Sequence, residues 1–566
     1  MMVDFQKTVL WIALVIVGFL LWNTWNEEHL ATANTAQVSL NESTNNADLP
    51  QVTAIDNSSS NAPSPVTTTN AIVTAGSDAA TTPVSADRFI HVKTDVLSLL
   101  IDTVGGQIVE LDLLDYPVSV QEPNQPVRLF DQKKGSIYMA QSGIISEDGP
   151  DKQQGAVQYR AKDTAFVMQD GQNQLDVVLT WESPDGVVFN KHFLFDRGQY
   201  VMNVRYDIEN NSNKAWQGQF YAQLKRERAE SAKSSLMAFP TYLGAAISTP
   251  EKRYEKVTFD DMDKEVIDRT VTDGWVAMVQ HYFTSAWIPE DNEPHRYYSR
   301  HVGDQYWIGL MASQVILQPG EKSQQQARLY AGPEITSELS KIAPGLELTV
   351  DYGWFWPISQ FLFWAMKHLH AFLGNWGLSI IGITILIKLL FYPLSASSYR
   401  SMAKLRQVQP KIVALKERHG DDKQKMSQAM MELYKKEKVN PLGGCLPILI
   451  QIPVFIALYW VLIESVELRQ APFYLWLHDL SVHDPFYILP LLMGISMFAQ
   501  QKLSPAPPDP MQAKVLMFMP VVFTVLFLNF PAGLMLYWIA NNVLSISQQW
   551  WITHSMEKAS ENTKDR

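Results

Sequence analysis

The stretch WGLSIIGITILIKLLFY, residues 376 to 392, decides the class of this chain, because it is apolar enough to cross a membrane as a helix. Lys388 interrupts this run. A charge kept inside a bilayer costs roughly 2.5–3.5 kcal/mol on insertion scales, so such a residue usually faces a wet cavity and has a function. Thr384 lies four residues earlier and shares its helix face. The alternative is that Lys388 snorkels to the nearer membrane interface.

Five further apolar runs predict five further spans. The first, residues 9–22, follows Lys7 and is flanked by tryptophans, which favours an uncleaved signal anchor over a cleaved signal peptide. The other four are residues 446–463, 487–500, 515–528 and 534–552. Several are short for about 30 Å of hydrocarbon, so the bilayer is expected to be thinned around them. The last two are joined by residues 529–533 alone and must form an antiparallel hairpin.

Between about residues 88 and 346 the hydrophobic period changes to two, as where Tyr200, Met202 and Val204 alternate with polar residues. Strand-like runs separated by Gly and Pro turns predict a large antiparallel sandwich. The expected fold class is therefore a polytopic α-helical membrane protein with six spans and a large extracytoplasmic antiparallel β-domain.

Composition divides the chain further. We expect a signal-anchor span at 1–26, a disordered linker at 27–86 rich in Ala, Thr, Ser and Asn, and the sandwich at 87–347. An aromatic amphipathic helix at 353–372 is expected to lie in the membrane surface. The helical core follows at 373–556, with a charged helical hairpin at 397–438, and the tail at 557–566 is short and charged.

Lys and Arg in the short loops set the predicted orientation. They gather in the hairpin, on both sides of the loop near residues 504–510, and at the C-terminus, so these segments and the N-terminus are expected in the cytoplasm. Residues 27–350 are then on the opposite side.

Several function classes lack support in the sequence. The net charge of −12 gives no reason to expect nucleic-acid binding, and the single cysteine, Cys445, has no neighbours at metal-ligand spacing. Nucleotide-binding, zinc and nucleophile-elbow motifs are missing, so we expect no enzyme activity, no metal and no cofactor. The histidines of residues 88–346 also lack metal spacing and are expected to be solvated or core residues.

Polar residues recur inside the predicted core spans. Taken singly, each is typical of hydrogen bonding between helices, but with an unpaired cation they indicate a hydrated interior. Since acidic residues occur only near helix ends, Lys388 is available to an external anion. Besides Lys388 and Thr384, the set comprises Gln451, Ser496, Thr524, Asn541, Asn542 and Ser545.

Several motifs in one order resemble the YidC-type bacterial membrane protein insertases, and together they cover almost the whole chain. They are GWVAMVQHYF at 274–283, NWGLSII at 375–381, SMAKLR at 401–406, QPK at 409–411, NPLGGC at 440–445, QIPVF at 451–455, VELRQAP at 466–472 and FPAG at 530–533.

This resemblance implies a periplasmic β-supersandwich and a five-helix insertase core with a hydrophilic groove open to cytoplasm and lipid. By position, Lys388, Thr384, Gln451 and Trp538 would belong to the groove. An incoming segment would slide along Ile452, Pro453 and Phe455. The implied location is the bacterial inner membrane. The implied partners are nascent membrane proteins, the lipid bilayer, the Sec translocon and, weakly, the ribosome.

The chain departs from the family pattern at two groove positions. Relatives commonly have Arg where Lys388 stands, and the charge is kept without the guanidinium fork. Trp538 stands where relatives often have Tyr. Compared with Tyr, the Trp side chain keeps a hydrogen-bond donor but lacks an acceptor. Two other hypotheses stay open: a small-anion transporter or channel that uses Lys388 as its binding cation, and a sugar-binding or sugar-modifying module at residues 88–346.

Overall fold

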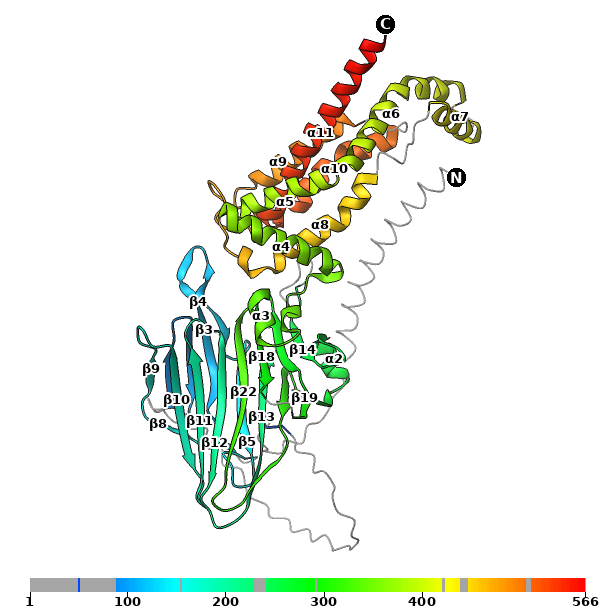
Figure 1. Cartoon of the computed structure of the whole chain (residues 1–566). Helices are drawn as coiled ribbons and strands as arrows, with labels where there is room; N and C mark the ends of the chain where they lie inside the picture. The colour runs from blue at the N-terminus through cyan, green and yellow to red at the C-terminus, as the bar shows by residue number, and fades with distance from the viewer. Residues whose placement is uncertain are drawn as a thin grey trace, which may run out of the picture.

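The computed structural model describes residues 49–50, 88–152, 155–228, 241–290, 293–419, 423–437, 446–504 and 510–564. It has two parts, a β-domain and a bundle of helices (Figure 1). The predicted first span, most of the linker and Cys445 lie outside the described residues.

The β-domain is built from two sheets. Within the described residues the larger sheet has 13 strands, nine of which follow the order β16-β19-β20-β13-β5-β3-β2-β1-β9, while the second has nine strands in the order β15-β14-β17-β18-β22-β12-β11-β10-β8. The strands of the larger sheet are β1 (Phe89–Lys93), β2 (Leu97–Asp102), β3 (Gln107–Ser119), β4 (Glu122–Phe130), β5 (Tyr138–Ile145), β6 (Asp151–Lys152), β7 (Gly155–Ala156), β9 (Ala165–Val167), β13 (Trp216–Glu227), β16 (Asp268–Val271), β19 (His295–Val302), β20 (Gln305–Met311) and β21 (Val315–Leu317). Those of the second are β8 (Arg160–Ala161), β10 (Gln174–Glu182), β11 (Val187–Asp196), β12 (Val201–Asn210), β14 (Gly244–Ser248), β15 (Glu255–Val257), β17 (Trp275–Gln280), β18 (Phe283–Pro289) and β22 (Lys322–Pro333).

The sequence pattern explains why these strands form. β12 alternates buried and half-buried residues along its whole length, because one face of a strand meets the core and the other does not. Its inward side chains Met202 and Val204 share one hydrophobic core with Phe220 and Leu224 of the other sheet. The predicted sandwich is confirmed. Most described strand pairs are antiparallel, and β1–β9 and β5–β6 are parallel.

Within the β-domain, the short helix α2 (Phe259–Lys264) lies between β15 and β16. The β-domain is joined to the bundle by the short helix α3 (Thr336–Ile342) and the 3₁₀ turns η2 (Leu346–Thr349) and η3 (Gly353–Phe355). The bundle comprises α4 (Trp356–Leu373), α5 (Trp376–Leu390), α6 (Tyr392–His419), α7 (Lys423–Lys436), α8 (Leu446–Glu464), η5 (Val466–Leu468), α9 (Ile488–Leu503), α10 (Pro510–Leu526), η6 (Phe527–Asn529) and α11 (Ala532–Lys564).

Local signals set the helix ends near the site. Gly374 ends α4 in the left-handed conformation (φ 64°), and the Asn375 side chain then accepts a hydrogen bond from Leu378 N to cap α5. The helix predicted over 376–392 is broken at its end: α5 stops at Leu390, and α6 starts afresh at Tyr392, with Pro393 in its first turn. Proline has no N–H to continue the previous helix but suits the first turn of the next one.

Among the described residues, the test of length and apolar composition for a membrane span is failed by every helix taken singly. The pair Trp376–Leu390 and Tyr392–Leu415, bent by 68° between its members, passes it together.

The predicted amphipathic helix corresponds to α4. It buries Ser359, Leu362 and Met366 and exposes aromatic side chains, among them Phe361, Trp364 and Phe372. Such an aromatic face suits the membrane interface.

Candidate substrate groove

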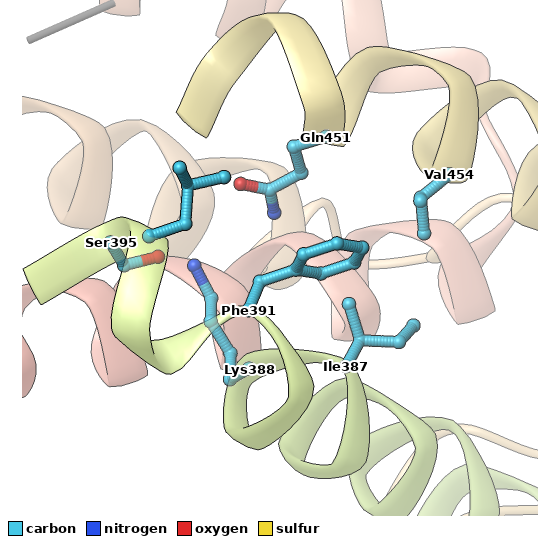
Figure 2. Close-up of a pocket in the computed structure, with 7 residues that line it drawn as sticks. Ile387, Lys388, Phe391, Ser395, Gln451 and Val454 are labelled. Carbon is cyan, nitrogen blue, oxygen red and sulfur yellow. The ribbon is translucent and has the colours of Figure 1, made fainter. Parts of the chain in front are cut away.

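A small cavity surrounds Lys388 at the bend between α5 and α6. Figure 2 shows the Lys388 side chain directed into it, with Gln451 facing from α8. None of the described residues that line the cavity is acidic; they are Ile387, Lys388, Phe391, Leu394, Ser395, Gln451 and Val454. The cavity volume is about 20 Å³, room for about one water molecule.

Lys388 is 8% exposed, so its charge lies inside the bundle and is not carried to a surface. Its Nζ donates a hydrogen bond to Ser545 Oγ of α11 at 2.8 Å, and Ser545 Oγ donates to Asn541 O at 2.7 Å. A hydroxyl satisfies one donor of the ammonium group but does not neutralise its charge. The ammonium group of Lys388 is therefore held against α11 inside the bundle.

Gln451 extends the polar contacts to a third helix. Its Nε2 donates to Asn541 Oδ1, and also lies 3.5 Å from Tyr537 Oη. Asn541 therefore contacts both Gln451 and Ser545, and a continuous polar seam crosses α8, α11 and α5. A buried seam of this kind holds helices in register and offers hydrogen bonds to a polar guest.

The other two predicted groove residues do not line this cavity. Thr384 is 1% exposed, and its Oγ1 donates to Ile380 O of its own helix at 2.6 Å. Trp538 is half-buried in an aromatic cluster, with its ring centroid 4.7 Å from that of Phe455 and 5.1 Å from that of Phe527. Trp538 thus contacts the α8 side chain predicted to guide substrate.

The predicted sliding residues lie on α8. Ile452 is 47% exposed and points out of the bundle, whereas Pro453 and Phe455 are half-buried. Pro453 lies inside the helix, where it removes one backbone donor.

Three residues that line the cavity around Lys388 were not predicted from the sequence: Phe391, Leu394 and Ser395. They line the cavity because the chain bends between α5 and α6. The sequence signal for this bend is the Tyr392-Pro393 pair at the start of α6. Tyr537 was also missed, although it neighbours Trp538. Asn542 joins two helices, as expected for a single polar residue, since its Nδ2 donates to Ser496 Oγ of α9 at 2.9 Å, whereas the Thr524 hydroxyl donates to Pro520 O of its own helix at 2.7 Å.

The chain thus joins a large β-sandwich to a helical bundle that holds a buried cation and a polar seam. Two family models match it in succession, the YidC periplasmic domain over residues 89–365 and the 60Kd inner membrane protein over residues 368–559. The chain belongs to the YidC family of membrane protein insertases.

Relatives support this along the whole length. The membrane protein insertase YidC of Pseudomonas entomophila strain L48 is 51% identical over 565 residues, covering 99% of each chain. That of Pseudomonas aeruginosa strain PAO1 is 48% identical over 584 residues, covering 99% of this chain and 100% of the relative. A crystal structure of an active YidC insertase with its first transmembrane domain resolved matches with a TM-score of 0.38 at 18% identity, over 82% of this chain and 92% of the other.

The chain is thus an insertase of the bacterial inner membrane with a periplasmic domain, and its function is not enzymatic.

Proposed function

We propose that the Lys388 cavity is the closed form of the groove through which this insertase passes the polar end of a nascent membrane protein. The observation that carries the proposal is a buried ammonium group with a hydroxyl partner and no acidic residue in its described lining. An acidic extracytoplasmic tail would supply the missing negative charge. The seam of Gln451, Asn541 and Ser545 would replace some of the water that the tail gives up.

The apolar segment that follows the tail leaves by the lipid side of α8. Ile452 is exposed there, and Phe455, held against Trp538, forms an aromatic surface beside it. Burial of apolar side chains in the bilayer supplies the free energy, about 25 cal/mol per Å², so insertion needs no nucleotide for this step. Thr384 lies one helical turn before Lys388, and its hydroxyl is bonded to Ile380 O of the same helix.

The cavity must widen before a peptide can enter. Its space suits about one water molecule, whereas a peptide needs the width of a backbone with side chains. Because the lining residues come from the α5–α6 bend and from α8, widening separates these two walls.

The finer topology also belongs to the proposal. Six spans, with both termini and the α6–α7 hairpin in the cytoplasm, agree with the distribution of Lys and Arg. We include as partners the nascent chain, the lipid bilayer, the Sec translocon and, weakly through the cytoplasmic loops, the ribosome. The proposed boundaries of the first span, the linker, the β-domain and the helical core are those predicted from composition.

The test is insertion of a single-span substrate with an acidic extracytoplasmic tail into proteoliposomes. Lys388→Arg should insert nearly as well as the unmodified protein, Lys388→Ala about tenfold less, equivalent to ~1.4 kcal/mol, and Lys388→Glu least, because its charge repels the tail. Lys322→Ala, which removes an exposed lysine of the β-domain, is the matched control. If Lys388→Ala and Lys388→Glu both insert as much substrate as the unmodified protein, the electrostatic role proposed for the groove is refuted. Saturable anion flux without insertion would favour the transporter hypothesis.

A further inference from the structure

The segment that follows α8 packs against the β-domain. Val466 is 3% exposed and belongs to the main hydrophobic cluster of the β-domain, although it comes more than a hundred residues after the last strand. Leu468 is 1% exposed and belongs to a second hydrophobic cluster, in which side chains of α5, α8 and α11 pack together with side chains of β14, β17 and β18. One short turn, η5, therefore has side chains in both clusters.

Arg469 and Gln470 fasten this segment to the hairpin of β3 and β4, which extends from the β-domain toward the bundle (Figure 1). Arg469 Nη2 donates to Pro117 O at 2.7 Å and to Val118 O at 3.0 Å, and Gln470 Nε2 donates to Pro117 O at 2.8 Å. The Arg469 guanidinium also lies 5.7 Å from the ring centroid of Phe283. The rigid fork of arginine donors makes this grip directional.

A second attachment lies at the end of α8 itself. His281, in the turn between β17 and β18, donates from Nε2 to Ile463 O at 2.9 Å. The last carbonyls of a helix have no partner within the helix, so the histidine satisfies one of them. Burial lowers the pKa of His281, which keeps the ring neutral with a donor for the carbonyl.

Both sides of this contact hold unusual backbone. Tyr282 has φ 72° and Gln470 has φ 57°, values in the left-handed region that side chains other than glycine rarely adopt. Such conformations persist only where surrounding contacts impose them. The strain therefore lies at the two points where the β-domain and the α8 segment meet.

We propose that Arg469 and His281 are positioning residues that clasp the periplasmic end of α8 to the β-domain. In this arrangement α8, which carries Gln451 and the sliding surface, is a fixed wall of the groove. The α5–α6 wall moves when the cavity opens. This assigns the periplasmic domain a mechanical part in insertion, and it rests on the proposed function of the groove.

The direct test measures a distance, so it does not depend on insertion. In a Cys445→Ser background, spin labels at Ile452 and Ile316 report the separation of α8 from the β-domain in the full chain, because both positions are exposed. The unmodified junction should give one narrow distance distribution. The double variant Arg469→Ala/His281→Ala should give a broad one. An unchanged distribution in the double variant overturns the clasp.

Insertion is then measured on unlabelled chains. The double variant should insert about fivefold less, equivalent to ~1 kcal/mol, while its dependence on Lys388 persists. His281→Gln keeps a donor for the carbonyl of Ile463, so a chain with this substitution should insert as well as the unmodified protein. Arg469→Lys keeps the charge without the fork of donors, so a chain with this substitution should insert less than the unmodified protein but more than the double alanine variant. Arg269→Ala, which removes a paired arginine of the β-domain, is the control. A broad distribution with full insertion would overturn the functional role of the clasp. If the unmodified protein inserts nothing, the proposed function fails, yet the distance measurement still decides the clasp.

Discussion

Removal of the buried lysine of the β-domain should destabilise the protein strongly. Lys191 of β11 is 0% exposed, and its Nζ donates to Gly106 O at 2.6 Å and to Ser142 O at 2.9 Å. Asp151, 1% exposed, accepts a hydrogen bond from Ile144 N at 2.9 Å. Burial lowers the pKa of Lys191 and raises the pKa of Asp151, and each charge opposes the shift of the other.

Lys191→Met removes the donor to the buried carbonyls of Gly106 and Ser142, and it removes the cation that opposes the rise in the pKa of Asp151, which together cost about 1–3 kcal/mol. For a domain of this size each kcal/mol corresponds to roughly 2–4 °C, so the Tm should fall by about 2–12 °C. Thermal unfolding of the full chain in detergent, followed by circular dichroism, measures the change. The double variant Lys191→Met/Asp151→Asn should recover part of the loss, because neither charge then remains. A Tm within about 2 °C of the unmodified protein for Lys191→Met would refute the argument.

Three further predictions follow from other contacts. Burial and two neighbouring carboxylates raise the pKa of Glu334 well above its usual range, so the stability that its protonated form gives is present at acid pH and lost as pH rises. In the same unfolding assay, Glu334→Gln should raise the Tm at about pH 8 and change it little at about pH 4. Gly494→Ala should lower the Tm because its methyl group would overlap Thr524 Oγ1, and Thr524→Ala should restore it; an unchanged Tm for the single variant would show that α9 and α10 can separate freely. Ser545→Ala removes the hydroxyl partner of Lys388 and should shift insertion toward more strongly acidic tails, measured with a tail series in proteoliposomes.

Patterns along the chain predicted those features that depend on one element at a time. The alternation in β12 and the apolar run of α5 each follow from which face of a single strand or helix meets the core. The same holds for Lys388, whose cost in hydrocarbon is a property of one residue.

Features that depend on how elements pack could not be predicted in this way. Thr384 shares a face with Lys388, yet the side chain that bonds Lys388 comes from Ser545 on α11, because helix rotation within the bundle decides the partner. The bend after Leu390 brings Ser395 over the cavity, although the run itself indicates one straight helix. The contact of His281 with Ile463 joins residues 182 positions apart, and neither lies in a periodic pattern that could indicate it.

The order of synthesis gives the junction a further consequence. Val466, which belongs to the main hydrophobic cluster of the β-domain, leaves the ribosome roughly 130 residues after the end of β22, which at bacterial elongation rates takes about 7–27 s. During that interval every strand of the sandwich has been synthesised, but the η5 segment that packs against the sandwich has not. The contacts of Val466 and Arg469 with the β-domain can therefore form only after the whole of α8 has been made.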